Sequence, residues 1–240
     1  MGELEANEIH AWTVGLDVSP KAGDALECVL SCDERARAAR YHSEAHRRRF
    51  ICGRAALRLL LGGYLGAEPK ALRLCYQTNG KPYVADLPDA LSFNVAHCEG
   101  LALIAVARNG DIGVDVERVR WLEDFDELVN RFFSKREAAL FRDLPWETKP
   151  EAFFNLWTRK EALLKATGGG ICNSLDRVEV TFLPGEPARL LSLPSEVGVD
   201  EWTLCDLAPE SGYAAALASS FSSFPILCGR FIPESTAMSL

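Results

Sequence analysis

Two acidic residues near the middle of the chain have the spacing of a ligand pair. Asp115 and Glu117 lie in residues 112–117, IGVDVE, where polar and apolar residues alternate as in a β-strand. Side chains of a strand repeat every two residues, so both carboxylates lie on one face, ~6.6 Å apart along the chain. The intervening Val114 and Val116 point the other way, into a core. Such a pair can bind a hard cation such as Mg²⁺, which takes few protein oxygens and keeps water or phosphate oxygens as its other ligands. The alternative is an exposed strand face that ends in a charged turn.

A second group of candidate functional residues lies about forty residues later, in WTRKEALLK (157–165). Trp157, Glu161 and Lys165 are four residues apart, so they form one stripe along a predicted helix. Taken alone, this pattern is more typical of an ordinary surface Glu–Lys pair beside a buried tryptophan, worth a few tenths of a kcal/mol.

The first half of the chain carries a local excess of positive charge. Eight arginines and one acid, Glu44, lie between residues 35 and 58, although the whole chain has a net charge of −8. The overall acidity argues against broad binding to nucleic acid or anionic membranes, so any anion site must be local. The turn NGKP (79–82) and His97 are further candidates. Each also has a simpler explanation, as an ordinary turn and as a core or rim histidine.

The elements that must position these residues follow from periodicity and turn signals. The first is a strand, and a long helix follows from Ser31 to the glycine breaks after residue 61. An Asn-Gly turn between apolar runs predicts a hairpin. Three further strands, joined by Glu99-Gly100 and Asn109-Gly110 turns, predict an antiparallel meander. The predicted strands are residues 9–16, 72–76, 81–84, 92–96, 101–107 and 112–117.

After residue 118 the pattern changes to helices. These are predicted at residues 122–133, 134–141 and 146–166. Ser134 and Glu137 have the spacing of a capping box that opens the second helix, and Gly168 follows the end of the third. Strands return at residues 177–182, 201–207 and 212–218.

The two parts of the chain share a pattern. Residues 202–218 resemble residues 91–107, since each has a strand, an acidic-Gly turn and an Ala-rich apolar strand. This similarity predicts a duplicated half. The expected organisation is an N-terminal half at 1–118, a C-terminal half at 119–220 and a tail at 221–240 that is expected to be partly disordered.

Composition is that of a globular protein. The chain has 240 residues, 48% apolar and 25% charged, which allows one large domain or two smaller ones with a large core. The longest apolar run near the middle has seven residues, far short of the roughly 20 of a membrane helix. The acidic N-terminus does not have the pattern of a secretory signal, so we expect a cytoplasmic protein. The eight scattered cysteines fit neither a zinc site nor a disulfide framework, and reduced, mostly buried thiols are expected.

The order of the segments and their amino-acid sequences resemble those of one family. FNVAHC (93–98), IGVDVE (112–117), FFSKREAALF (132–141) and FFNLWTRKEALLKATGGG (153–170) are similar to the signature blocks of Sfp-type 4′-phosphopantetheinyl transferases, especially cyanobacterial members. RRRFICGR (47–54) and NGKP (79–82) fall where that family has its coenzyme A contacts. The similarity covers about residues 30–218.

The resemblance implies an α+β fold, a pseudo-dimer of two similar halves in one monomeric chain, with coenzyme A bound between them. It implies transfer of 4′-phosphopantetheine from coenzyme A, the substrate, to a serine of an apo acyl, peptidyl or polyketide carrier protein, with release of adenosine 3′,5′-bisphosphate. It implies that Mg²⁺ is the cofactor and that neither nucleic acid nor a membrane is a partner.

The resemblance also implies roles for individual residues. Glu161 becomes a metal ligand, and Lys165 contacts the phosphates or the leaving group. The chemistry of the reaction also makes Glu161 the candidate general base, directly or through a metal-bound water, and the sequence does not separate its ligand and base roles. Ala96 departs from the family, which usually has Ser there, so the hydrogen bond of that hydroxyl to a phosphate is absent. The implied Mg²⁺ ligands are Asp115, Glu117 and Glu161, and the implied coenzyme A contacts are Arg49, Gly80, Lys81, Pro82, Ala96, His97 and Lys165.

Elementary chemistry agrees with this assignment. Attack on a pyrophosphate requires neutralisation of charge on phosphate oxygens, which a cation with Lys and Arg side chains supplies. The serine nucleophile belongs to the carrier protein, so the chain needs no nucleophile motif of its own.

Two alternatives stay open at this point. One is a non-catalytic module that binds carrier protein or coenzyme A, suggested by Ala96. The other is an Mg²⁺-dependent phosphohydrolase built on Asp115 and Glu117. The sequence determines neither the carrier protein served nor the tolerance for acyl-coenzyme A.

Overall fold

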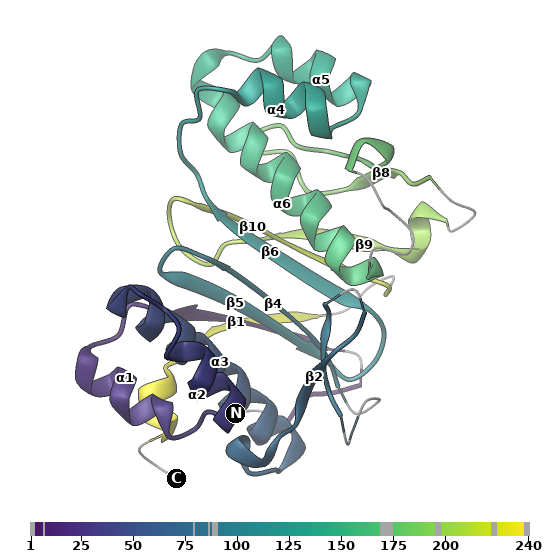
Figure 1. Ribbon diagram of the computed structural model, residues 1–240. Helices are drawn as coiled ribbons and strands as arrows, with labels where there is room; N and C mark the ends of the chain where they lie inside the picture. The colour runs from purple at the N-terminus through teal and green to yellow at the C-terminus, as the bar shows by residue number, and fades with distance from the viewer. Residues whose placement is uncertain are drawn as a thin grey trace.

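Two sheets pack against each other at the centre of the molecule, and a long helix covers the outer face of each (Figure 1). The computed structural model describes residues 3–6, 8–78, 80–85, 87, 91–168, 175–194, 198–221 and 225–237. The helices are α1 (Pro20–Glu27), α2 (Cys32–Ala38), α3 (Glu44–Leu65), α4 (Phe125–Phe132), α5 (Lys135–Arg142), α6 (Lys149–Thr167) and α7 (Pro233–Ala237). The strands are β1 (Ile9–Gly15), β2 (Leu74–Tyr76), β3 (Pro82–Val84), β4 (Ser92–Cys98), β5 (Leu101–Ala107), β6 (Ile112–Arg118), β7 (Glu179–Val180), β8 (Leu190–Ser192), β9 (Thr203–Leu207), β10 (Tyr213–Ser219) and β11 (Ile226–Arg230).

The first sheet has the strand order β11-β1-β5-β4 and carries α3. Strand β5 is buried along its whole length because β1 and β4 flank it on both edges. Helix α3 begins at Ser43, whose hydroxyl accepts a hydrogen bond from the His46 backbone N–H, and ends at Gly66, which has a φ of 62°. Its apolar face packs on β4 and β5 in one continuous core.

The second sheet has the strand order β6-β10-β9 and carries α6. Helix α6 has Pro150 in its first turn and ends at Gly168, which has a φ of 63°. Ahead of it, α5 begins with the predicted capping box, because the Ser134 hydroxyl and the Glu137 carboxylate accept from each other's backbone N–H groups. Helices α4 and α5 cover the far end of α6 in Figure 1.

The two halves repeat one topology, which confirms the α+β fold of two similar halves. In each, a strand is followed by helices and then by an antiparallel hairpin, and the first strand pairs with the second strand of that hairpin. The order β1-β5-β4 thus corresponds to β6-β10-β9, and α3 corresponds to α6. A third apolar cluster, which includes Ala105 and Val114, joins the inner faces of the two sheets.

The predicted meander of three strands is wrong at its third member. Strands β4 and β5 pair as expected, but β6 pairs with β10. The reason is that β1 and β4 occupy both edges of β5, so no backbone groups are left there for β6. The predicted first half, 1–118, therefore contributes a strand to the second sheet.

The long helix predicted from Ser31 is divided in two. Helix α2 ends at Ala38, and α3 starts at Glu44 after an N-cap at Ser43. The buried carboxylate of Glu34 joins the two pieces, since it pairs with Arg54 and Arg58 of α3. The Arg58 guanidinium also donates to the carbonyls of Pro69 and Leu72.

In the C-terminal segment, predicted as a partly disordered tail, the described residues form a strand and a short helix. Strand β11 pairs in parallel with β1, and α7 packs against α1 and α3. The side chain of Phe231 joins the core of the first half. Sequence periodicity missed β11 because an edge strand with mostly exposed residues has no alternating pattern. Residues 222–224 and 238–240 of this predicted tail lie outside the described residues.

Two expectations from composition can be compared with the structure. In the described parts of the chain, none of the helices combines the length and the apolar character needed to cross a membrane. Seven cysteines in those parts are free thiols, as expected, but only Cys52 is fully buried. The expectation of mostly buried thiols is therefore wrong, because several cysteines lie on exposed faces such as those of α2 and β11.

Candidate active site

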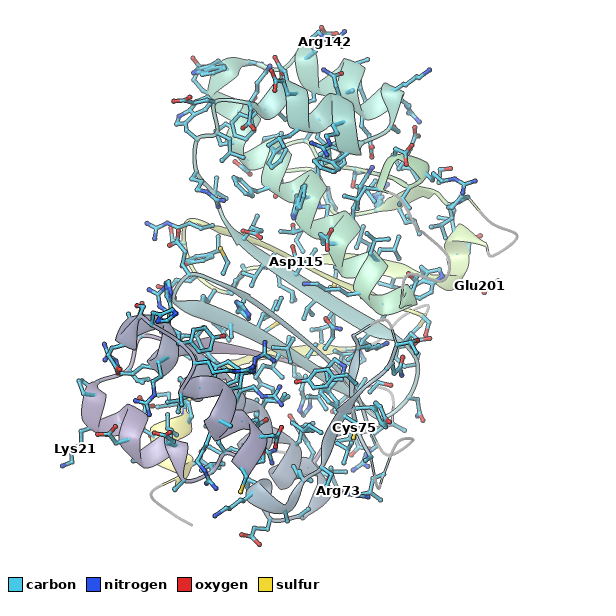
Figure 2. The ribbon with its side chains drawn as sticks, viewed as in Figure 1. Lys21, Arg73, Cys75, Asp115, Arg142 and Glu201 are labelled. Carbon is cyan, nitrogen blue, oxygen red and sulfur yellow. The ribbon has the colours of Figure 1, made fainter. Side chains whose placement is uncertain are left out.

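The close approach of β6 and α6 creates the candidate site. Gly113 of β6 faces α6, and a Cβ atom there would overlap the Ala162 carbonyl oxygen and the Ala166 backbone nitrogen. Because strand side chains alternate, Asp115 and Glu117 lie on the same face as Gly113. The glycine thus lets the helix lie directly over the strand that carries the two carboxylates, with Asp115 between the two halves of the molecule (Figure 2).

Asp115 is a buried carboxylate with one ion-pair partner. Its Oδ1 accepts a hydrogen bond from the Lys165 Nζ at 2.7 Å, and only 6% of the residue is exposed. Its Oδ2 is buried and has no hydrogen-bond partner among the described residues. Burial raises the pKa of Asp115, and the attraction of the Lys165 ammonium offsets only part of this.

Glu161 and Glu117 add negative charge beside Asp115. Burial and the nearby charge of Asp115 raise the pKa of Glu161, Glu117 adds to the effect, and Lys165 opposes it. Glu117 itself accepts a hydrogen bond from the Cys98 thiol at 3.2 Å and lies 3.8 Å from the Arg120 guanidinium. The structure therefore places the predicted acidic residues near one another, and their negative charges repel.

This arrangement fits a bound cation. Within the described residues, no three His, Cys, Asp or Glu side chains converge closely enough to form a metal centre, and Lys165 supplies the positive charge beside Asp115. However, a buried carboxylate oxygen without a partner is costly, and two neighbouring carboxyl groups have raised pKa values. Carboxylate oxygens are the ligands that Mg²⁺ prefers, so Asp115, Glu117 and Glu161 have the chemistry to hold it.

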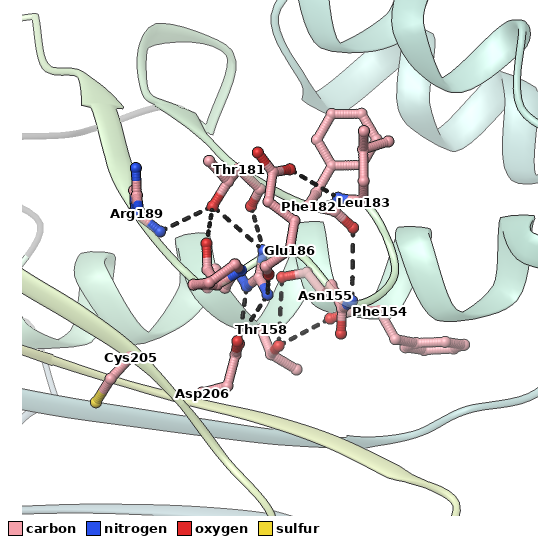
Figure 3. A network of polar contacts seen from close by, with 12 residues as sticks. Phe154, Asn155, Thr158, Thr181, Phe182, Leu183, Glu186, Arg189, Cys205 and Asp206 are labelled. Carbon is pink, nitrogen blue, oxygen red and sulfur yellow. Dashed lines mark hydrogen bonds and ion pairs between the residues drawn. The ribbon is translucent and has the colours of Figure 1, made fainter.

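Buried ion pairs fix α6 in place. Arg159 is 2% exposed, and its guanidinium binds Asp206 of β9 with two hydrogen bonds of 2.8 Å and the Thr181 carbonyl at 2.6 Å (Figure 3). Next to it, the Lys160 ammonium pairs with the buried Glu137 of α5 and donates to the Leu175 carbonyl. These contacts fix the rotation of α6 about its axis and so determine which of the following helix residues face β6.

Two cavities lie near this group, and the smaller one is lined by Lys165, the partner of Asp115. One, of about 400 Å³, lies between the halves and includes Lys81, Lys165 and Gly168 in its wall. The other, of about 500 Å³, is lined by α3 and β4 and contains several cationic side chains. Pro82 and Val95 line both, so the two cavities are neighbours.

Most predicted coenzyme A contacts lie in these cavities. Arg49 and His97 line the larger one, and Gly80, Lys81 and Lys165 line the smaller one. These residues come from α3, β4, the β2–β3 turn and α6.

Lys81 also reaches across to the second half. Its Nζ donates to the Asp111 carboxylate at 3.1 Å and to the Ala166 carbonyl at 3.3 Å. The turn between β2 and β3, whose pairing was predicted, therefore lies beside the end of α6. Asn79 of this turn lies outside the described residues.

Ala96 is the predicted contact that the structure does not bring to the site. It is 4% exposed and packs with Leu103 and Val114 in the apolar cluster between the sheets. The neighbouring Val95 and His97 point to the opposite face of β4, toward the larger cavity. A serine hydroxyl at position 96 would thus enter an apolar environment.

Sequence reasoning missed several residues that shape the site. Gly113 could have been found, because a glycine two residues before an acid in a strand marks a close backbone approach on that face. Arg159 and Lys160 gave no such signal. Charged residues in a helix are normally exposed, and the partners of these two, Asp206 and Glu137, lie far away in the sequence.

Comparisons with known proteins agree with this geometry. Residues 19–109 match the family described as 4′-phosphopantetheinyl transferase, N-terminal, and residues 111–218 match the 4′-phosphopantetheinyl transferase superfamily. The 4′-phosphopantetheinyl transferase HetI of Nostoc sp. is 43% identical over 217 residues, which cover 90% of this chain and 89% of that protein. The putative 4′-phosphopantetheinyl transferase of Synechocystis sp. is 36% identical, over 74% of this chain and 72% of its own.

One more distant relative in sequence has the same description. The 4′-phosphopantetheinyl transferase Sfp of Bacillus subtilis is 27% identical over 87% of this chain and 90% of its own. Among solved structures, the holo-[acyl-carrier-protein] synthase of Thermotoga maritima has a TM-score of 0.35 and 20% identity, over 45% of this chain and 61% of that chain. The relative with 43% identity over nine-tenths of the chain is decisive. The chain belongs to the 4′-phosphopantetheinyl transferase family, as its sequence motifs predicted.

Proposed function

We propose that this protein transfers 4′-phosphopantetheine from coenzyme A to a serine hydroxyl of an apo carrier protein. The observation that carries the proposal is the group formed by Asp115, Glu161 and Lys165 at the meeting of β6 and α6, near two cavities lined by cationic side chains. Carboxylates, an ammonium and a cationic wall are what transfer from a pyrophosphate requires.

The proposed step forms one bond and breaks another. The serine Oγ bonds to the phosphorus that bears pantetheine, and the diphosphate P–O bond breaks, which releases adenosine 3′,5′-bisphosphate. The serine proton goes to a base, for which we propose Glu161, because its carboxylate lies beside the charges of Asp115 and Lys165. Lys165 donates hydrogen bonds toward the phosphate oxygens.

The residues that would hold Mg²⁺ are Asp115, Glu117 and Glu161. When bound, the ion supplies positive charge for the phosphate oxygens. Arg49, Lys81 and His97, from α3, the β2–β3 turn and β4, would bind the remaining phosphates and the nucleotide in the two cavities. Gly80 lines the smaller cavity and Pro82 lines both.

We further propose a monomeric, cytoplasmic enzyme whose partners are acyl, peptidyl or polyketide carrier proteins. Two similar halves in one chain support the monomer, since the site at their meeting is complete without a second copy. The division of the chain into 1–118 and 119–220 is part of this proposal, with β6 at the end of the first segment lying in the second sheet.

The test is transfer to purified apo carrier proteins, followed by intact mass. With coenzyme A and Mg²⁺, the carrier gains one phosphopantetheinyl group, and a carrier whose serine is replaced by alanine gains none. A panel of carriers identifies the class served. Full activity in excess chelator would contradict the Mg²⁺ assignment. Binding of coenzyme A without transfer would support a non-catalytic module, and cleavage of coenzyme A without any carrier would support a phosphohydrolase.

A further inference from the structure

Asp17 holds the side chain of Arg49 with two hydrogen bonds. The Arg49 Nε donates to Oδ1 of Asp17 at 2.6 Å, and Nη2 donates to Oδ2 at 3.0 Å. A two-point contact of this kind fixes both the position and the plane of a guanidinium. A guanidinium has five N–H donors, so three remain after Asp17 takes two. No residue in the described ranges accepts a hydrogen bond from these three.

The backbone around Asp17 leaves a defined space for its carboxylate. The Leu16 N–H donates to the Gly100 carbonyl at 2.7 Å, which ties the end of β1 to the turn between β4 and β5. A Cβ atom at Gly100 would overlap Oδ2 of Asp17. The missing side chain at Gly100 therefore leaves the space that the carboxylate occupies.

Arg49 lines the larger cavity together with Leu16 and His97, and its carboxylate partner Asp17 does not. The side chain of Arg49 is 30% exposed and that of Asp17 is 63% exposed. The contact is thus made at the rim, and the remaining donors of Arg49 are free for an anion in the cavity.

We propose that Asp17 is a positioning residue that preorganises Arg49 for a phosphate group of coenzyme A. This inference rests on the proposed function, in which coenzyme A occupies the cavity. A guanidinium that is already held need not be ordered when the substrate binds, so less binding free energy is lost. The opposite role is competition, in which the Asp17 carboxylate and the phosphate bind the same donors of Arg49. The two roles predict changes of opposite sign.

The test measures coenzyme A binding by calorimetry and transfer by steady-state kinetics. We expect Asp17→Ala to raise both the Kd and the KM for coenzyme A by about three- to tenfold, and to leave kcat within about twofold. The exposed ion pair contributes little to folding, so Tm should hardly change.

A matched control lies on the same helix. The Arg47 Nη2 donates to both oxygens of Glu27, at 3.0 and 2.8 Å, and neither residue lines a cavity. Glu27→Ala removes the same charge and the same kind of contact. Its coenzyme A KM should stay within about twofold of that of the wild type, because no anion-binding group is released.

Two further variants test whether Asp17 acts through Arg49. Gly100→Ala should displace the carboxylate without removing its charge, and should raise the KM in the wild type but not in the Asp17→Ala background. In an Arg49→Ala background, Asp17→Ala should have no further effect.

An unchanged or lowered KM in Asp17→Ala, an equal effect of Glu27→Ala, or an effect that persists without Arg49 would overturn the positioning role alone. Failure of the wild type to bind coenzyme A would overturn the proposed function with it.

Discussion

At the residue scale, the buried carboxylate of Asp115 destabilises the folded state and has a role in the proposed reaction. Its carboxylate is buried, one oxygen lacks a partner, and its pKa is raised by burial. Such a group is less stable in the folded protein than in water, unless a cation is bound beside it. This is the pattern expected where function, not stability, determines the residue.

We therefore expect Asp115→Asn to reduce transfer by at least about 10²-fold, because it removes charge next to the transferring phosphate. The Tm without added metal should be unchanged or higher, because the amide carries no buried charge. Both are measured on the purified variant, by transfer assay and thermal unfolding. The exposed Asp24→Asn in α1 is the control and should change neither. A large fall in Tm for Asp115→Asn would show a structural role instead.

At the element scale, the packing of α6 on β6 depends on Gly113. Its missing side chain lets the helix backbone touch the strand. The ion pairs of Arg159 and Lys160 then fix the rotation of α6. Together these contacts determine the distance between the Lys165 ammonium and Asp115.

Gly113→Ala is expected to push α6 away from β6, because the new methyl group would meet helix backbone that cannot rotate aside. We expect overpacking to cost about 1–3 kcal/mol and transfer to fall by at least about tenfold. Urea unfolding and the transfer assay measure the two effects. Gly198→Ala is the control, since a Cβ there has no atom closer than 3.7 Å. A fully active Gly113→Ala variant would contradict this account of the site.

The junction of α2 and α3 makes a prediction about pH. Burial raises the pKa of Glu34, but the hydrogen bond and charge of Arg58 and the charge of Arg54 outweigh it, and the net pKa is lowered. A lowered pKa in the folded state means that the ion pair stabilises the fold above the ordinary pKa of about 4.5 and is lost as pH falls through the lowered value.

At pH 7, Glu34→Gln should reduce the free energy of unfolding by about 3 kcal/mol, because it leaves Arg58 buried without its counterion. The difference from the wild type should shrink as the pH is lowered below the ordinary pKa of Glu. Urea unfolding across this range measures it. The exposed Glu44→Gln should stay within about 0.5 kcal/mol of the wild type throughout. A difference that is independent of pH would contradict the assignment.

At the scale of the whole molecule, the end of the described chain completes the core of the first half. Strand β11 covers the outer edge of β1, and α7 lies against α1 and α3. The first half is thus built from both ends of the sequence, and the second half lies between them.

Neighbouring residues after β11 test this closure. Phe231 is 8% exposed and belongs to the core, whereas Ile232 is 54% exposed. Phe231→Ala should reduce the free energy of unfolding by about 3 kcal/mol, through lost burial and a new cavity, and Ile232→Ala by less than about 0.5 kcal/mol. Denaturant unfolding compares the two variants. Equal effects would mean that this segment does not stabilise the core.

Much of this protein could be predicted from its sequence. Strand alternation placed Asp115 and Glu117 on one face with Val114 and Val116 in a core, and the capping box at Ser134 marked the start of α5. These are local effects, set by side-chain period and by hydrogen bonds within a few residues. The repeated hairpin pattern predicted the duplication, and the motifs predicted the family.

Only the tertiary structure decided how these pieces meet. Strand β6 lies in the second sheet because β5 has no free edge. The side chain of Ala96 faces the apolar cluster instead of the cavity. Arg159 is buried in the folded protein and pairs with Asp206, 47 residues away. Such outcomes depend on which strand edges are already occupied and on which distant charge satisfies a buried one. Local periodicity determines the face of a residue, but the partner of that face is set by the packing of the whole chain.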